Sequence, residues 1–187
     1  MRIIGGKFKG KKILEPKDKE TRPLKDLTKE SIFNIISHSN KFSINLEGSC
    51  VLDLFSGTGS FGLECLSRKA KHVTFVENYK KVLPILKKNL LNLKSINNYK
   101  IIQKDILKNL EITSFKEKFD IIFLDPPYKE NNVDKLLNLI LKIELFKNDG
   151  IIIIHRYKKQ KDKFPNSFKI IEEKVYGISK IIFGTYS

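Results

Sequence analysis

The chain has 187 residues, of which 41% are hydrophobic and 30% are charged, as in an ordinary globular protein. This length suits a single domain that carries a small appendage. No apolar run approaches the roughly 18 residues that would span a membrane, and the basic N-terminus lacks the apolar stretch of a secretory signal. We therefore expect a cytoplasmic protein without a membrane-spanning segment.

The net charge of +15 points to a polyanionic partner, most simply nucleic acid. A bias in composition is the alternative, because nearly all of the basic residues are lysine, and isoleucine and asparagine are also abundant. The acidic residues are too few to balance this excess of basic residues, which a bias in composition alone does not require. Because arginine is scarce in this chain, each arginine is a candidate for a specific contact, since lysine cannot replace a guanidinium at a bidentate site. They are Arg2, Arg22, Arg68 and Arg156.

The two cysteines, Cys50 and Cys65, lie in apolar contexts. Neither has a histidine or a second cysteine at the spacing of a metal site. We expect both thiols to be reduced and buried, and we expect no metal.

The first 45 residues differ in character from the rest of the chain. A basic stretch rich in glycine, MRIIGGKFKGKK, precedes the segment RPLKDLTKESIFNIIS. In that segment the spacing of an amphipathic helix is shown by Leu27, Ile32, Phe33, Ile35 and Ile36. We expect residues 1–45 to form a basic hairpin and a helix that extend a core domain of residues 46–187.

The core domain alternates strand and helix patterns. Strand patterns cover residues 50–55, 72–77, 100–105, 119–125 and 150–156, and helix patterns cover residues 60–68, 79–93 and 133–145. Buried strands separated by helices predict a parallel sheet with helices on both faces. Two further strand patterns, residues 168–177 and 178–186, predict an antiparallel hairpin that closes the sheet.

A glycine-rich loop joins the first strand of the core to its helix. Gly57, Gly59 and Gly62 have the G-x-G-x-x-G spacing, and Glu77 ends the next strand. This pattern suits a dinucleotide, and it suits S-adenosylmethionine (SAM) equally well. Both ligands need a close approach to the backbone and a carboxylate for the ribose hydroxyls.

Charge decides between the two cofactors. Asp53 lies just before the loop, where it would repel a pyrophosphate but attract the ammonium group of SAM. The alternative is that Asp53 only caps the following turn. Asp105 ends the third strand, where it could accept a hydrogen bond from the adenine amine or cap the residues that follow.

The strand of residues 119–125 ends in the turn Asp-Pro-Pro-Tyr. Ligands bind at the carboxyl ends of strands in open α/β sheets, so Asp125 lies at the ligand edge. The amine of a purine ring is a poor nucleophile. The Asp125 carboxylate and the carbonyl of Pro126, which the proline ring holds in place, can accept its hydrogens. Tyr128 offers a face for stacking a displaced base. The alternative is an ordinary proline-containing turn.

The chain resembles the RsmD family over nearly its whole length, on five segments in the same order: MRIIGGKFKGKKI, RPLKDLTKESIFN, LDLFSGTGSFGLECLSR, FLDPPY and KVYGISKIIF. That family methylates the N2 amine of a guanine in small-subunit (16S) ribosomal RNA. The resemblance implies a Rossmann-like α/β methyltransferase domain over residues 46–187, with a mainly parallel seven-stranded sheet and an antiparallel C-terminal hairpin. It implies SAM as the cofactor and ribosomal RNA, or the small ribosomal subunit, as the partner.

The resemblance also implies roles for single residues. SAM contacts are implied at Asp53, Gly57, Gly59, Glu77 and Asp105, and we add the neighbours Phe55, Asn78 and Ile106 to the predicted cofactor site. The catalytic turn is matched by Asp125, Pro126 and Tyr128. The start of a segment beside the active site is matched by Arg22 and Pro23.

Three residues depart from the family pattern. Leu24 stands where threonine is usual, Leu27 where arginine is usual, and His155 where glutamate is common. We assign no chemistry to His155, nor to His38 and His72, because the three histidines are far apart in the sequence.

We expect the RNA to contact the basic head, where lysines and arginine would lie along its phosphates. Such contacts position the substrate without reading its sequence. The alternative is a solvated edge strand that lysines protect from pairing. The predicted substrate-binding residues are Arg2, Lys7, Lys9, Arg22, Pro23, Pro127 and Tyr128. We interpret the later basic run RYKKQKDK, residues 156–163, as a solvated loop.

The sequence therefore favours a monomeric guanine-N2 methyltransferase of 16S rRNA. A DNA amino-methyltransferase is the nearest rival, although the chain leaves little room for a target-recognition region. An NAD-dependent oxidoreductase is disfavoured by Asp53 and by the lack of an obvious proton relay. A catalytically silent RNA-binding protein is disfavoured by the intact Asp-Pro-Pro-Tyr turn.

Overall fold

The computed structural model describes residues 1–17, 24–107, 115 and 117–186. In chain order its elements are α1 (Asp26–His38), β1 (Cys50–Leu54), α2 (Ser60–Ser67), β2 (His72–Glu77), α3 (Leu83–Leu91), β3 (Tyr99–Gln103), β4 (Phe119–Leu124), α4 (Val133–Lys142), β5 (Phe146–Tyr157), β6 (Phe168–Tyr176) and β7 (Ser179–Tyr186). None of these helices is long and apolar enough to cross a membrane.

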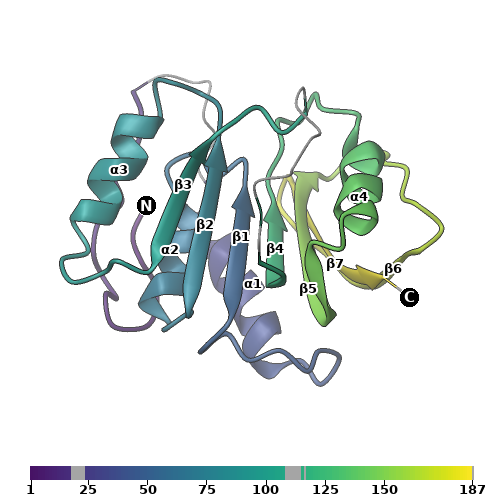
Figure 1. Ribbon diagram of the computed structural model, residues 1–187, viewed down its shortest axis with the longest axis horizontal. Helices are drawn as coiled ribbons and strands as arrows, with labels where there is room; N and C mark the ends of the chain where they lie inside the picture. Colours follow the sequence, from purple (N-terminus) through teal and green to yellow (C-terminus); the bar gives the residue numbers. More distant parts are fainter. Residues whose placement is uncertain (18–23, 108–114, 116, 187) are drawn as a thin grey trace.

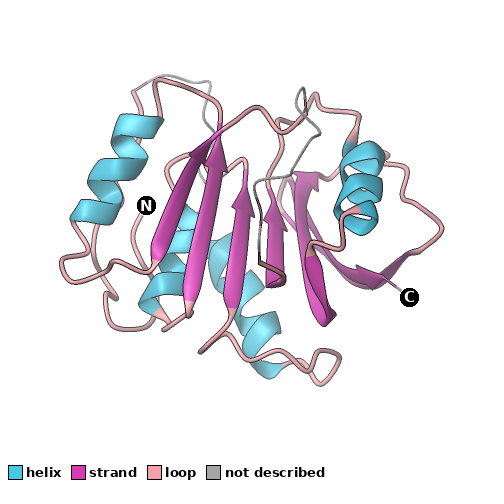
Figure 2. Ribbon diagram, in the orientation of Figure 1, coloured by secondary structure: helices cyan, strands magenta, loops and turns pink. Residues whose placement is uncertain are grey.

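The strands form a seven-stranded sheet in the order β3-β2-β1-β4-β5-β7-β6 (Figure 1). Strands β1 to β5 pair in parallel, and β7 pairs antiparallel with both β5 and β6. This arrangement confirms the predicted mainly parallel sheet with an antiparallel C-terminal hairpin. Helices cover both faces, as Figure 2 shows.

Two apolar cores follow from the alternation of side chains along the buried strands. Val51, Ile121 and Ile153 face α1, α2 and α3 in one core. Leu52 and Ile122, which are the next residues along their strands, face α4 in the other core. Because both faces are covered, the strands read as continuous apolar runs in the sequence.

The largest differences from the predicted element boundaries are at the starts of α3 and β5. The helix predicted from Tyr79 begins at Leu83, with Pro84 in its first turn, where a missing N–H costs no intrahelical hydrogen bond. The strand predicted from Gly150 begins at Phe146, which pairs with Phe119 before a shift in register.

The register of the parallel strands aligns their carboxyl ends. Leu54 of β1 lies beside Val76 of β2 and beside Leu124 of β4. Leu124 in turn lies beside Ile154 of β5. The next residue on each strand therefore emerges at one edge of the sheet. These next residues are Phe55, Glu77, Asp125 and His155.

The N-terminal stretch forms a small antiparallel contact between Arg2 and Lys12, as the predicted hairpin requires. It is packed against the core, because Ile3, Phe8 and Ile13 are buried in the same cluster as α1 and α2. The backbone N–H groups of Lys7 and Phe8 donate to the carbonyl and hydroxyl of Ser67, at 2.8 and 2.9 Å. The lysines of the stretch remain exposed.

A fully buried lysine links this stretch to the core. The Lys29 ammonium donates to the Arg2 carbonyl at 2.6 Å and to the Ser60 hydroxyl at 3.3 Å. It also lies 3.6 Å from an oxygen of Asp26 and 3.8 Å from one of Glu64. Burial lowers the pKa of Lys29, although both carboxylates favour its charged form.

We expect Lys29→Met to lower the free energy of unfolding by about 3 kcal/mol, because it leaves the buried Glu64 without this cation and the Arg2 carbonyl without a donor. Denaturant titration measures the change. Lys25→Met, at an exposed position just before the same helix, should change stability by no more than about 0.5 kcal/mol. Equal effects of the two substitutions would contradict the role given to Lys29.

Candidate active site

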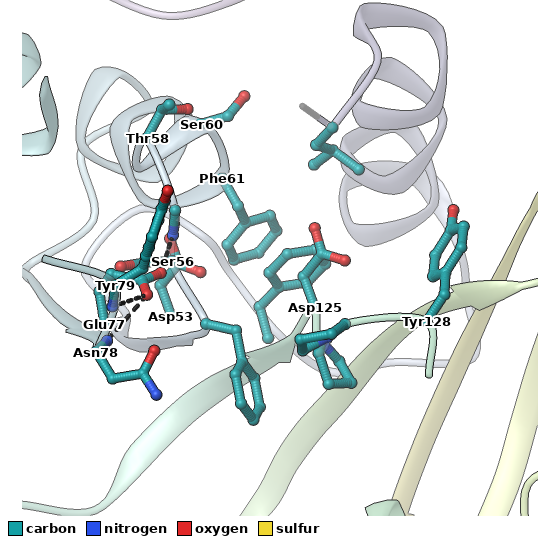
Figure 3. Close-up of a pocket in the computed structure, with 16 residues that line it drawn as sticks. Asp53, Ser56, Thr58, Ser60, Phe61, Glu77, Asn78, Tyr79, Asp125 and Tyr128 are labelled. Carbon is teal, nitrogen blue, oxygen red and sulfur yellow. Dashed lines mark hydrogen bonds between the residues drawn. The ribbon is translucent and has the colours of Figure 1, made fainter. Parts of the chain in front are cut away.

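A hollow of about 530 Å³ lies at the carboxyl edge of β1, β2 and β4, a size typical of small-molecule sites. Many of the predicted site residues line it, namely Asp53, Phe55, Gly57, Glu77, Asn78, Asp125, Pro126, Pro127 and Tyr128. Figure 3 shows Glu77, Asn78 and Tyr79 at one end of the hollow and Tyr128 at the other, with Asp125 between Phe61 and Tyr128.

The glycine-rich loop turns sharply on left-handed backbone. Gly57 and Gly59 have φ values of +52° and +83°, and Phe55 has a φ of +59°. Such a φ is uncommon for a bulky residue, and strain of this kind gathers at functional sites. The loop is tied to the neighbouring strand by the Ser56 N–H, which donates to the Val76 carbonyl at 3.1 Å.

Gly62 allows α2 to pack closely on the sheet. A Cβ atom at this position would come within 2.2 Å of the Phe75 ring and 2.9 Å of a Val73 methyl group. The third glycine of the motif therefore serves the contact between helix and strand, while the first two shape the loop.

Asp53 is buried at the base of the hollow and accepts a hydrogen bond from the Gly62 N–H at 3.0 Å. The turn contact considered as an alternative is therefore present, and Asp53 also lines the hollow. Burial raises the pKa of Asp53 well above its ordinary value, and the carboxylates of Asp125 and Glu77 raise it further. A cation bound here would offset that repulsion.

Glu77 holds the second strand end in place. One of its oxygens accepts from the Gly57 N–H at 2.6 Å, and the other accepts from the N–H groups of Asn78 and Tyr79 at 2.9 and 2.8 Å. Each carboxylate oxygen has two lone pairs, so one acceptor site, on the oxygen bound by Gly57, remains for a ligand hydroxyl.

The residues present fit SAM. Three carboxylates around one hollow favour a ligand with positive charge, and Glu77 can accept from a hydroxyl. The Ser56 hydroxyl also lines the hollow, and it is buried without a hydrogen-bond partner among the described residues. A buried polar atom of this kind is satisfied when a ligand supplies its partner.

The Asp-Pro-Pro-Tyr turn is anchored from two sides. The Asp125 N–H donates to the Leu54 carbonyl at 3.3 Å. On the other side, the Arg156 guanidinium donates to the carbonyls of Pro127 and Glu130, at 3.2 and 2.5 Å. It also donates to the buried Asp162 carboxylate at distances from 2.8 to 3.1 Å.

The interpretation of residues 156–163 as a solvated loop is therefore wrong for its first residue. Arg156 is fully buried and belongs to β5. The lysines that follow Arg156 give the segment the composition of a solvated loop, whereas the scarcity of arginine in the chain indicates a specific contact for this residue.

Aromatic rings form the walls of the hollow. Phe61 and Phe123 stack at 4.1 Å between centroids, with an interplanar angle of 14°. Tyr128 stacks on Tyr157 at 5.5 Å. The sequence analysis did not assign a role to several lining residues, which are Leu24, Ser56, Thr58, Ser60, Phe61, Tyr79 and Phe123. The apolar phenylalanines among them, Phe61 and Phe123, have the sequence pattern of core positions.

His155 also differs from the sequence interpretation, which assigned it no chemistry. Its Nδ1 lies 2.8 Å from an oxygen of Asp125. The two residues are 30 positions apart in the chain, and their contact depends on β4 and β5 being paired neighbours.

Other predicted residues lie away from the described lining of the hollow. Asp105 accepts from the Leu107 N–H at 3.1 Å, and most of the segment that it was predicted to cap as an alternative lies outside the described residues. Ile106 is buried in the core beside α4. Gly59 shapes the loop but is not among the lining residues described. A cofactor contact at these three positions stays a prediction.

The structure describes some of the residues predicted to contact RNA. Arg2 is exposed and pairs with Asp26, and Lys7 lies over the Phe8 ring at 5.4 Å. Lys9 is exposed. Arg22 and Pro23 lie outside the described residues. Within the described part of the chain, no cluster of histidine, cysteine or acidic side chains could hold a metal ion.

Comparison with known proteins places these features in a family. A family model described as Conserved hypothetical protein 95 matches residues 1–185. The Ribosomal RNA small subunit methyltransferase D of Haemophilus influenzae is 34% identical over 179 residues, which cover 95% of this chain and 90% of that protein. The protein of the same name from Buchnera aphidicola subsp. Acyrthosiphon pisum is 35% identical over 173 residues, covering 92% and 86%.

A solved structure shares the fold along the full chain. It is "Putative methyltransferase yhhF from Escherichia coli", with a TM-score of 0.81 and 27% sequence identity. The match covers 100% of this chain and 97% of that one.

We expect Arg156→Met to destabilise the protein by about 3 kcal/mol, because it leaves the Asp162 carboxylate buried without its cation. Arg156→Lys should recover only part of this loss, since an ammonium cannot reproduce the bidentate contact. Denaturant titration measures both. Lys159→Met, at an exposed position, serves as the control and should stay within about 0.5 kcal/mol of the wild type.

We expect the affinity for SAM to fall as the pH decreases through the raised pKa of Asp53, because a protonated carboxyl no longer attracts a cation. Asp53→Asn should weaken binding by about tenfold or more above that pKa and remove this pH dependence. Calorimetric titration at several pH values measures the effect. Asp149→Asn, at an exposed position away from the hollow, should keep the wild-type profile.

Proposed function

The chain belongs to the Conserved hypothetical protein 95 family, which is the RsmD family, and we propose that it transfers a methyl group from SAM to the N2 amine of a guanine in 16S ribosomal RNA. It is a SAM-dependent rRNA methyltransferase, and its relatives are named Ribosomal RNA small subunit methyltransferase D. The observation that carries the proposal is the position of Asp125, which lies in the same hollow as the acidic cofactor residues.

The residues of the hollow divide into two groups with different tasks. Asp53, Glu77 and Ser56 line the part that would hold the cofactor, through charge and hydrogen bonds. When bound, SAM supplies a methyl group on a positively charged sulfur, which is already an electrophile, so the proposal invokes no metal. Asp125 and Tyr128 line the part left for the base.

Asp125 and the Pro126 carbonyl would hold the guanine amine by accepting its hydrogens, which aims the nitrogen lone pair. The proline rings restrict the turn, and Arg156 fixes the Pro127 carbonyl behind it. Tyr128 would stack on the base once it leaves its neighbours. Holding two reactants in a productive geometry can supply roughly 7–11 kcal/mol of the barrier, so positioning accounts for most of the rate.

The basic head is the proposed contact surface for the RNA backbone. Residues 1–45 are proposed as an extension of the methyltransferase domain, with Arg2, Lys7 and Lys9 contacting phosphates. Exposed lysines on this packed stretch support the proposal. Arg22 and Pro23 are proposed to approach the target guanine, since Leu24 immediately after them lines the hollow.

An rRNA substrate belongs in the cytoplasm, and we propose that location for the protein. We also propose that the chain acts as a monomer. The substrate would be ribosomal RNA within the small subunit or one of its assembly intermediates.

We expect labelled methyl groups to pass from SAM to small subunits isolated from a strain that lacks this gene, and mapping should place the product at one guanine. Naked DNA should stay unlabelled, whereas labelling of DNA alone would favour the DNA amino-methyltransferase. Calorimetry should detect binding of SAM and not of NAD, which tests the oxidoreductase alternative.

We expect Asp125→Ala to abolish turnover while the affinity for SAM stays within about threefold of the wild type, because Asp125 acts on the amine. Asp149→Ala is the matched control at an exposed aspartate and should keep wild-type turnover. Weakened SAM binding with normal turnover at saturation would contradict the role of Asp125.

A further inference from the structure

Three polar side chains lie in a row on one face of the sheet, from three successive strands. Asp125 follows β4, His155 is on β5 and Ser179 begins β7. His155 Nδ1 lies 2.8 Å from Asp125 Oδ1, and His155 Nε2 lies 2.9 Å from Ser179 Oγ. The row ends at the hollow, because Asp125 lines it.

The pairing of the strands creates this row. Leu124 and Ile154 are register partners, so Asp125 and His155 follow them side by side. His155 points to the same face as Ile153, two residues before it, and Ser179 to the same face as Ile181. Asp125 shares that face with Phe123.

His155 is enclosed by its neighbours. Its side chain is only 6% exposed, and the Tyr128 ring packs edge-on against it at 6.0 Å. Both ring nitrogens have a partner. A ring held in this way has little rotational freedom, so the position of its Nδ1 is well defined.

The chemistry of the three groups assigns the direction of the hydrogen bonds. A carboxylate only accepts, so Nδ1 carries the hydrogen that it donates to Asp125. Nε2 of the neutral ring then accepts from the Ser179 hydroxyl. The Asp125 carboxylate thus fixes the tautomer, and the Ser179 hydroxyl, which can donate or accept, supplies the hydrogen bond that this tautomer requires at Nε2.

This contact occupies one oxygen of Asp125 and restrains the rotation of its carboxylate. Oδ2 is then the oxygen available to the substrate amine. A carboxylate without this restraint would sample orientations in which it cannot accept from the amine. Misplacement of a reacting group lowers the reaction rate strongly.

We propose that His155, held by Ser179, is a positioning residue that orients the Asp125 carboxylate toward the amine to be methylated. This inference rests on the proposed function, in which Asp125 accepts the amine hydrogens. It assigns His155 a task in the reaction without contact with the substrate or the cofactor.

Two substitutions separate positioning from packing. In His155→Asn the amide nitrogen occupies about the place of Nδ1 and can still donate to Asp125, whereas His155→Leu fills similar space without a donor. We expect His155→Leu to slow single-turnover methyl transfer to small subunits about tenfold to a hundredfold, the loss of one hydrogen bond to a charged group. His155→Asn should stay within about threefold of the wild type.

Binding measurements complete the comparison. The KM for small subunits and the affinity for SAM should change by less than about threefold in both variants, because the lost contact acts on the orientation of Asp125. His38→Leu, at an exposed histidine, is the control and should leave the rate unchanged.

A spectroscopic measurement tests the contact without turnover. The chain has three histidines, so ¹⁵N-histidine labelling yields three imidazole signal sets, and the set missing from His155→Asn is that of His155. We expect a protonated Nδ1 for His155, with a resonance that shifts in Asp125→Ala and not in Asp149→Ala.

A wild-type rate in His155→Leu overturns the inference, and so does an equal loss in His155→Leu and His155→Asn, which would show that packing alone matters. An unprotonated Nδ1 overturns it as well. A wild-type protein that transfers no methyl group overturns the proposed function itself, and the catalytic part of this inference with it. That outcome is distinct from an active wild type whose rate does not depend on His155.

Discussion

The site depends on the register of the parallel strands. Leu54, Val76, Leu124 and Ile154 are aligned across β1, β2, β4 and β5, so the residues that follow them lie at the same level of the sheet. The residues that follow reach one hollow from separate parts of the chain. A shift by one residue in any pair would turn the following side chain to the opposite face of the sheet. The buried faces of the sheet prevent such a shift, because it would expose apolar side chains and bury polar ones.

Around this edge the protein tolerates several arrangements that are unfavourable for stability. Asp53 is buried near two other carboxylates, and Phe55 has left-handed backbone. Lys29 and Arg156 are fully buried cations, each held by carboxylates and carbonyls. The two cations have a common structural effect, since Lys29 attaches the N-terminal stretch behind the glycine loop and Arg156 fixes the turn opposite. Buried charge here supports a defined geometry and contributes little net stability.

The features predicted from sequence are those with local causes. The glycine loop was predicted from the G-x-G-x-x-G spacing within one strand-loop-helix unit. The structure shows what the glycines do, because Gly57 and Gly59 have left-handed backbone and Gly62 leaves room for Phe75 of β2. Pro84 lies in the first turn of α3 for an equally local reason, because proline has no N–H to donate within a helix. The contacts of His155 and Arg156 could not be predicted in this way. Asp125, Pro127 and Glu130 lie 26 to 30 residues away toward the N-terminus, and Ser179 lies on another strand. Polarity alone did not show which face each side chain takes.

The sequence by itself determined the fold class, the cofactor class and the turn that carries Asp125. Periodicity, glycine spacing and charge act over a few residues, so they can be interpreted without the structure. Only the tertiary structure decided that Leu24, Phe61 and Phe123 wall the hollow, that Arg156 is buried beneath the turn, and that His155 lies against Asp125. Those relations arise from the order and register of the strands, which bring together residues that are distant in sequence and give no local signal of their meeting.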